Sequence, residues 1–119
     1  MSGTILLVED EHNIGALVRT YLQRDGFDVI WVRTGEDALT ELVRHPIALM
    51  VLDIGLPRMN GYEVARAIRQ MPGLVNVNII AATGYGQLED RQRAREAGFD
   101  HYLVKPIELD VLLQTLAPR

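Results

Sequence analysis

The chain has 119 residues, which is enough for one domain and for a core that buries roughly two-thirds of the unfolded chain's surface. The absence of cysteine excludes disulfides, thiolate catalysis and zinc sites built on thiolates. With 12 lysines and arginines against 16 acidic residues the formal net charge is −4, and no basic patch is present, so direct binding to nucleic acid is not expected.

Five strand-length apolar runs follow one another along the sequence. They cover residues 5–8, 29–32, 48–52, 79–82 and 102–104. Each is far shorter than the roughly 20 residues that a membrane-spanning helix needs. Residues 1–3 are too few for a signal peptide, so we expect a cytoplasmic protein and no membrane contact by this domain.

Segments with helical periodicity lie between and after these runs. Their apolar residues recur at spacings of i, i+3, i+4 and i+7, which predicts amphipathic helices. The pattern comprises Ile14, Leu17, Val18, Tyr21 and Leu22; then Ala38, Leu39, Leu42 and Val43; then Val64, Ala65, Ile68 and Met71; and finally Leu109, Leu112, Leu113 and Leu116.

Capping signals mark the ends of the predicted helices. Two pairs have the spacing of an N-terminal capping box, namely Thr34 with Asp37 and Asn60 with Glu63. Two glycines follow helical segments and are typical C-terminal stops, namely Gly26 and Gly98.

A further helix is predicted over residues 87–97, and it offers few large apolar side chains to the sheet. Glu89 and Arg93 have the i, i+4 spacing of a weak surface ion pair. We therefore expect this helix to be weakly anchored, with a face that is either simply solvated or used by partners.

The alternation of strands and helices predicts the fold class. Strands that are apolar throughout are typical of a parallel sheet that helices cover on both faces, connected by right-handed crossovers. An eight-fold barrel would need about twice this length. No linker, repeat or low-complexity stretch interrupts the pattern, so we expect one open, doubly wound α/β domain over residues 1–119.

Acidic residues stand where two of the predicted strands stop. Glu9 and Asp10 follow the first run and Asp53 follows the third. Ligands of doubly wound sheets bind at the carboxyl ends of strands, where the strand order reverses. Three carboxylates brought together there repel one another unless a cation offsets them, and an all-oxygen ligand set suits Mg²⁺. For Glu9 and Asp10 the alternative is that they only begin a helix, near its positive dipole end.

Two more polar residues end the remaining strands. Thr83 closes the fourth run, and Lys105, the only lysine of the chain, closes the fifth. A hydroxyl and a compact ammonium are thereby expected at the same rim, where the ammonium can neutralise a carboxylate or a phosphoryl oxygen.

These residues lie in four motifs, at residues 7–11, 52–61, 82–84 and 102–106, whose order and spacing together are specific. The motifs read Leu-Val-Glu-Asp-Glu, Leu-Asp-Ile-Gly-Leu-Pro-Arg-Met-Asn-Gly, Ala-Thr-Gly and Tyr-Leu-Val-Lys-Pro. Over nearly its whole length the chain resembles the receiver domain of response regulators in two-component signalling. The resemblance implies a flavodoxin-like (βα)5 three-layer sandwich with strand order 2-1-3-4-5.

The resemblance also implies roles for the site residues. Asp53 would be the nucleophile that accepts a phosphoryl group from a phosphohistidine or a small acyl phosphate. Asp10, Asp53 and the backbone carbonyl of Gly55 would bind Mg²⁺ directly, and Glu9 would act through water. Lys105 would pair with Asp53 before transfer and with a phosphoryl oxygen afterwards, aimed by a cis bond to the following proline.

The same resemblance implies a switch and its partners. Thr83 would donate its hydroxyl to the phosphoryl group, and Tyr102 would turn inward to fill the vacated space. The output surface would lie within about residues 83–116. The phosphoryl donor would be a histidine kinase or a histidine phosphotransfer domain, and the output partner is not specified by the sequence.

Other functions of the same fold fit less well. A flavin phosphate would be repelled by Glu9, Asp10 and Glu11, and aspartyl-nucleophile hydrolases carry a second carboxylate where this chain has Gly55. Turnover on an outside substrate is therefore not expected. An interaction module that works without phosphorylation remains an open alternative. The parent protein is also open: we favour a receiver cut from a hybrid sensor kinase, and the alternative is a stand-alone regulator.

Three histidines and the tryptophan are given structural roles. His12, His45 and His101 are isolated from one another in the sequence, and none has the setting of a phosphohistidine site. Trp31 lies in a strand and is expected to pack.

Overall fold

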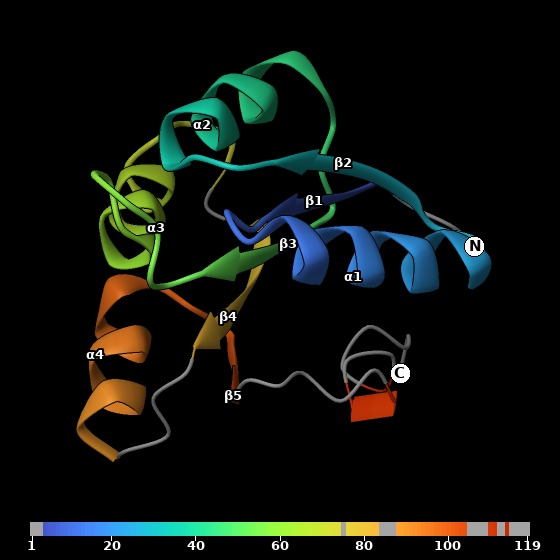
Figure 1. Ribbon diagram of the computed structural model, residues 1–119. Coiled ribbons are helices and arrows are strands. Elements are labelled where there is room, and N and C mark those ends of the chain that lie inside the picture. Colours follow the sequence, from blue (N-terminus) through green and yellow to red (C-terminus); the bar gives the residue numbers. More distant parts are fainter. Residues whose placement is uncertain (1–3, 75, 84–87, 105–109, 112–113, 115–119) are drawn as a thin grey trace.

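The computed structural model describes residues 4–74, 76–83, 88–104, 110–111 and 114 (Figure 1). Five strands form one parallel sheet in the order β2-β1-β3-β4-β5, which confirms the predicted topology. They are β1 (Thr4–Val8), β2 (Asp28–Val32), β3 (Leu49–Asp53), β4 (Asn78–Thr83) and β5 (His101–Val104). The third strand begins one residue later than predicted, and Asp53 is its last residue.

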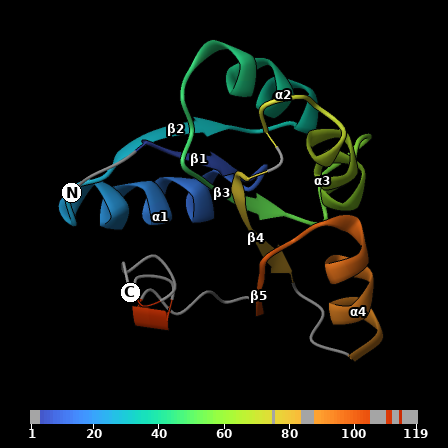
Figure 2. The ribbon, with the colours of Figure 1, turned by 180° about the vertical axis from the view of Figure 1, so that it is seen from behind.

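Four helices cover the sheet on two sides. They are α1 (His12–Arg24), α2 (Gly35–Arg44), α3 (Gly61–Arg69) and α4 (Leu88–Ala97). Figures 1 and 2 show α1 on one face and the other three helices on the opposite face. Of the fifth predicted helix the structure describes only Asp110, Val111 and Gln114, each in helical conformation, and the leucines of its pattern lie outside the described residues. No helix in the described part of the chain has the length and apolar character needed to cross a membrane.

The strands divide their side chains between two cores, because successive residues of a strand point to opposite faces. Leu6, Val8, Met50 and Leu52 belong to the core under α2, α3 and α4. The residues between them belong to the core under α1, namely Ile5, Leu7, Leu49 and Val51. The central strands are therefore apolar in sequence because both of their faces are covered.

The predicted capping signals are present. The Thr34 hydroxyl accepts a hydrogen bond from the backbone N–H of Asp37, and Asn60 and Glu63 form a complete capping box. Gly26 and Gly98, which follow α1 and α4, have φ values of 96° and 110°. These are left-handed conformations that favour glycine.

The predicted third helix ends earlier than its apolar pattern. The pattern extends to Met71, but α3 ends at Arg69 and Gln70 caps it, so the assignment of Met71 to the helix was wrong. Met71 precedes Pro72, and a residue before proline is disfavoured in helical conformation.

The buried side of α1 is also different from the predicted apolar stripe. Leu17 and Tyr21 are 54% and 40% exposed, whereas Gly15, Val18 and Leu22 are buried. The helix lies close to β2 at Gly15, where an added Cβ would come within 2.2 Å of the Trp31 ring. Because α1 faces the sheet with Gly15 at this point, Leu17 and Tyr21 lie on the side of the helix that is turned away from it.

Among the side chains of α4 that the structure describes, those buried in the core are small. Ala94 and Ala97 are 1% and 2% exposed, and both lie in the core that α3 shares. The guanidinium of Arg93 lies over the ring of Tyr62 on α3, at 4.5 Å from the ring centroid. The side chain of Glu89, and with it the predicted pair with Arg93, lies outside the described residues.

Candidate functional site

The three acidic side chains predicted to converge do so. One carboxylate oxygen from each of Glu9, Asp10 and Asp53 lies within 4.8 Å of the other two. Glu9 directly follows β1 and Asp53 ends β3, and these strands are neighbours in register, with Val8 opposite Leu52. The parallel pairing of β1 and β3 therefore brings the acids together.

Two of these acids are almost fully buried. Glu9 is 3% exposed and Asp53 is 5% exposed, while Asp10 is half-buried. Repulsion between like charges is strongest away from water. A cluster of three carboxylates that is largely buried is therefore suited to hold a cation, which offsets this repulsion. The donor set consists of oxygens, which are the ligands that Mg²⁺ prefers.

The alternative that Glu9 and Asp10 merely begin a helix is not what the structure shows. The N-cap of α1 is Glu11, whose carboxylate accepts a hydrogen bond from the backbone N–H of Asn13. Glu9 instead turns its carboxylate to the backbone N–H of Glu11, at 3.1 Å. Its side chain therefore stays within the acidic cluster.

Side chains from the end of β2 hold the backbone that carries the acidic pair. The indole N–H of Trp31 donates to the carbonyl of Glu9 at 3.0 Å. Arg33 donates twice to the carbonyl of Asp10, at 3.2 and 2.8 Å. The sequence interpretation gave Trp31 only a packing role and missed Arg33. Trp31 and Arg33 lie beside Glu9 and Asp10 because β1 and β2 pair in register. This pairing can be anticipated only once the order of the strands is known.

The loop after β3 holds Asp53 from two directions. The backbone N–H of Gly55 donates to Oδ1 of Asp53 at 3.1 Å. Gly61, the first residue of α3, lies so close that an added Cβ would come within 2.7 Å of the Asp53 carbonyl oxygen and 2.6 Å of the Ile54 Cα. Sequence reasoning missed this function of Gly61, although a glycine inside a capped helix start is a signal for close packing.

The remaining predicted site residues lie on β4 and β5 or outside the described part. Thr83, the last residue of β4, is 2% exposed and pairs in register with Val104. Tyr102 is half-buried and pairs with Ala81. Lys105, its predicted pairing and the predicted cis bond lie outside the described residues.

The strand order and the position of the acids define the class of protein. This is a doubly wound α/β domain with an oxygen-ligand site at the carboxyl ends of β1 and β3, where the strand order reverses. The family model described as the response regulator receiver domain matches residues 5–117. The chain therefore belongs to the receiver domains of two-component signalling, and the predicted resemblance is confirmed.

Two curated relatives illustrate the kinds of protein in which similar chains occur. The sensor histidine kinase RcsC of Salmonella typhimurium is 37% identical over 114 residues, which are 95% of this chain but only 12% of RcsC. The polar-differentiation response regulator DivK of Brucella ovis is 29% identical over 116 residues, covering 98% of this chain and 94% of DivK.

Solved structures have the same architecture. The chemotaxis protein CheY4 of Vibrio cholerae has a TM-score of 0.92 at 28% identity, covering 98% of this chain and 97% of CheY4. The signal receiver domain of a histidine kinase from Syntrophus aciditrophicus has a TM-score of 0.89 at 29% identity, covering 97% of this chain and 87% of that domain. The flavodoxin-like fold is thus shown by both sequence and structure.

Proposed function

We propose that this receiver domain accepts a phosphoryl group on Asp53 from a phosphohistidine of a histidine kinase or a histidine phosphotransfer domain. The observation that carries the proposal is the convergence of Glu9 and Asp10 on Asp53 at the end of β3. The chemistry ends on the chain's own side chain, so the domain is a signalling module and not an enzyme that turns over an outside substrate.

The transfer is a nucleophilic displacement at phosphorus. A carboxylate oxygen of Asp53 attacks the phosphorus and forms an O–P bond. The N–P bond of the donor breaks, and its electron pair returns to the imidazole nitrogen. The hydrogen bond from Gly55 to Oδ1 supports this role because it restricts the orientation of the carboxylate. Hydrolysis of the resulting aspartyl phosphate by water returns the domain to its starting state.

The acidic cluster is proposed to bind Mg²⁺. Asp10, Asp53 and the backbone carbonyl of Gly55 would hold the ion directly, and Glu9 would act through water. When bound, Mg²⁺ screens the charge of the incoming phosphoryl group. Lys105 is proposed to pair with Asp53 and then with a phosphoryl oxygen.

Thr83 and Tyr102 are proposed to carry the switch. The buried Thr83 hydroxyl would donate to the phosphoryl group, and Tyr102 would turn inward from its half-buried position. Phosphorylation shifts such an equilibrium only as far as it favours one state. The output surface would lie within about residues 83–116.

The parent protein is proposed to be a hybrid sensor kinase, with this domain on its cytoplasmic side. The likeness to a short part of RcsC supports this origin. A stand-alone regulator is the second candidate, and the likeness to nearly all of DivK favours it. Whether the reading frame continues beyond residue 119 decides between them.

The proposed acceptor is tested by incubation with acetyl phosphate and Mg²⁺, followed by mass spectrometry of the intact chain. We expect the addition of one phosphoryl group, no addition in Asp53→Asn, and normal addition in Asp25→Asn, which removes an exposed carboxylate elsewhere. An unchanged mass, under conditions that label a known receiver, would favour the phosphorylation-independent module instead.

A further inference from the structure

Asp10 lies between two elements, after the end of β1 at Val8 and before the start of α1 at His12. A backbone outside strands and helices depends on other partners for its polar groups. Asp10 is also half-buried, whereas Glu9 and Asp53 are almost fully buried. As a proposed direct ligand of Mg²⁺, Asp10 therefore depends on contacts from elsewhere for its orientation.

The end of β2 supplies contacts to the backbone on both sides of Asp10. The backbone N–H of Glu9 donates to the carbonyl of Val32 at 3.1 Å, and the indole N–H of Trp31 donates to the carbonyl of Glu9 at 3.0 Å. The Nε and Nη2 atoms of Arg33 both donate to the carbonyl of Asp10, at 3.2 and 2.8 Å. Two successive carbonyls thus accept hydrogen bonds from the side chains of Trp31 and Arg33.

These two carbonyls belong to the two peptide groups on either side of the Asp10 Cα. Because each peptide group is planar, two backbone dihedral angles at Asp10 set the direction of its side chain. A hydrogen bond to each peptide group restrains both angles. Trp31 and Arg33 together therefore restrict the direction in which the Asp10 carboxylate leaves the backbone.

Helix α1 holds the indole of Trp31 in place. The ring of His12 lies 5.5 Å from the indole, centroid to centroid, and the central guanidinium carbon of Arg19 lies 5.1 Å from the indole centroid. At Gly15, between these two residues, an added Cβ would come within 2.2 Å of the ring. The indole N–H is therefore held in its direction toward the Glu9 carbonyl.

Arg33 serves a carbonyl rather than a surface ion pair. The residue is exposed, and no ion pair of Arg33 is found in the part of the chain that the structure describes. A guanidinium carries its donors in a rigid fork, and two of them converge here on one oxygen. The arginine is therefore committed to the backbone of Asp10.

We infer that Trp31 and Arg33 are positioning residues of the acidic cluster and set its affinity for Mg²⁺. They act through the two peptide groups, by holding Asp10 in the orientation that binds the ion. Groups that orient metal ligands contribute about tenfold to a hundredfold to metal affinity. That this affinity serves phosphoryl transfer rests on the proposed function.

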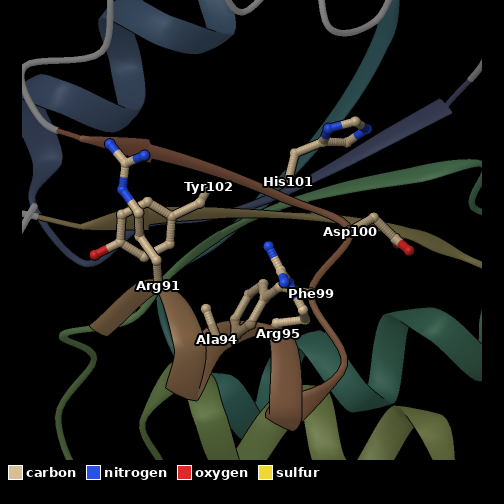
Figure 3. Close-up of a pocket in the computed structure, with 7 residues that line it drawn as sticks. All are labelled: Arg91, Ala94, Arg95, Phe99, Asp100, His101 and Tyr102. Atoms are coloured by element: carbon tan, nitrogen blue, oxygen red, sulfur yellow. The ribbon is translucent and has the colours of Figure 1, made fainter. Parts of the chain in front are cut away.

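Arg33→Lys tests the arginine at constant charge. Lysine lacks the fork of donors, so the full ¹⁵N-labelled chain should bind Mg²⁺ about threefold or more weakly in a titration followed by amide shifts. The matched control is Arg95→Lys, at an exposed arginine beside a cavity between α4 and β5, at the other edge of the sheet from β2 (Figure 3). Wild-type affinity in Arg33→Lys would mean that only the charge at this position matters, and would overturn the inference for Arg33.

Trp31 is the only tryptophan of the chain, and its N–H can be removed without loss of the ring. Nonsense suppression at this position introduces benzothienylalanine, in which sulfur replaces the N–H and the bicyclic shape is kept. We expect Mg²⁺ binding to weaken by about tenfold, and Trp31→Phe should weaken it as well. Wild-type affinity of the benzothienylalanine protein would overturn the inference for Trp31.

The dependence of labelling on Mg²⁺ separates positioning from a merely structural role. With acetyl phosphate, both changes should raise the Mg²⁺ concentration for half-maximal labelling of Asp53 by the same factor as the dissociation constant. The rate at saturating Mg²⁺ should equal that of the wild type, and so should the urea midpoint of Arg33→Lys without Mg²⁺. A rate that is lower at every Mg²⁺ concentration, together with a lower urea midpoint, would overturn the inference.

The inference and the proposed function fail in different experiments. Weaker Mg²⁺ binding in both variants, without labelling of Asp53 in the wild type, would overturn the phosphoryl-acceptor function and leave the positioning of the metal site intact. Labelling of Asp53 with the same Mg²⁺ dependence in the wild type and both variants would overturn the inference alone.

Discussion

At the level of single residues, the acidic cluster depends on groups that are not acidic. Trp31 and Arg33 hold the carbonyls of Glu9 and Asp10, so the backbone under both acids is fixed before any ligand arrives. The backbone N–H of Gly55 likewise holds the carboxylate of Asp53 in place by a hydrogen bond to Oδ1. Such preorganisation lowers the entropy that ligand binding would otherwise cost.

Asp10→Asn should weaken Mg²⁺ binding by about tenfold or more, because it removes one negative charge and a direct ligand from the cluster. The matched control is Asp28→Asn, which makes the same charge change at an exposed position in register with Thr4, at the opposite end of the strands. A magnesium titration followed by amide shifts in NMR measures both. Equal affinities of the two variants would remove Asp10 from the proposed ligand set.

At the level of elements, the segment that leads from β3 into α3 has two glycines with different functions, Gly55 in the loop and Gly61 at the first position of the helix. Gly61 permits α3 to begin against the backbone of Asp53, where an added Cβ would overlap main-chain atoms. Gly55 has space, since an added Cβ would meet only Asp53 Oδ1, at 3.7 Å. Close packing requires a glycine at position 61 but not at position 55.

Gly61→Ala should lower the free energy of unfolding by about 1–3 kcal/mol, the usual range for overpacking. Gly55→Ala should change it by no more than about 0.5 kcal/mol, as is usual for unconstrained surface positions. Urea denaturation followed by circular dichroism compares the two. Equal stability of Gly61→Ala and the wild type would mean that the loop moves away from Asp53 without cost, and labelling of Asp53 in this variant would then show whether the site survives.

At the level of the whole molecule, the two cores meet at the central strands, and burial decreases toward the two edge strands, β2 and β5. Strands β1, β3 and β4 are almost wholly buried, whereas β2 and β5 are mostly half-buried, and the side chains of α4 that the structure describes as buried are alanines. Elements with few large buried side chains open at low cost in free energy. The side of the molecule formed by α4 and β5 is thus suited to change without disturbing the rest.

Beryllofluoride, a mimic of the phosphoryl group, should therefore slow amide hydrogen exchange in residues 88–104 and at Thr83. The physical reason is that a hydroxyl held by the mimic at the end of β4 favours one state of the neighbouring elements. Exchange in β2 and α2 should stay the same, and Asp53→Asn should show no response. A change confined to residues next to Asp53 would contradict the proposed switch.

The predicted elements and the predicted acids agree with the structure for a local reason. Periodicity and capping residues such as Asn60 and Glu63 act within a few positions, so the sequence alone identified the five strands and the starts of α2 and α3. The two errors have different causes: Pro72 ends α3 locally, whereas the exposed side of α1 follows from its close approach to β2 at Gly15. Met71 carried the apolar pattern beyond the end of α3, and Leu17 and Tyr21 continued the stripe of α1 onto its exposed side.

By itself the sequence determined the alternation of strands and helices and the acids that end the first and third strands. The order of the strands came from the resemblance to a family and not from the pattern. Only the tertiary structure decided that three carboxylates lie within 4.8 Å of one another, that Trp31 and Arg33 support them and that Gly61 must lack a side chain. These features depend on which strands are neighbours and how closely helices approach, and neither is encoded within a short stretch of chain.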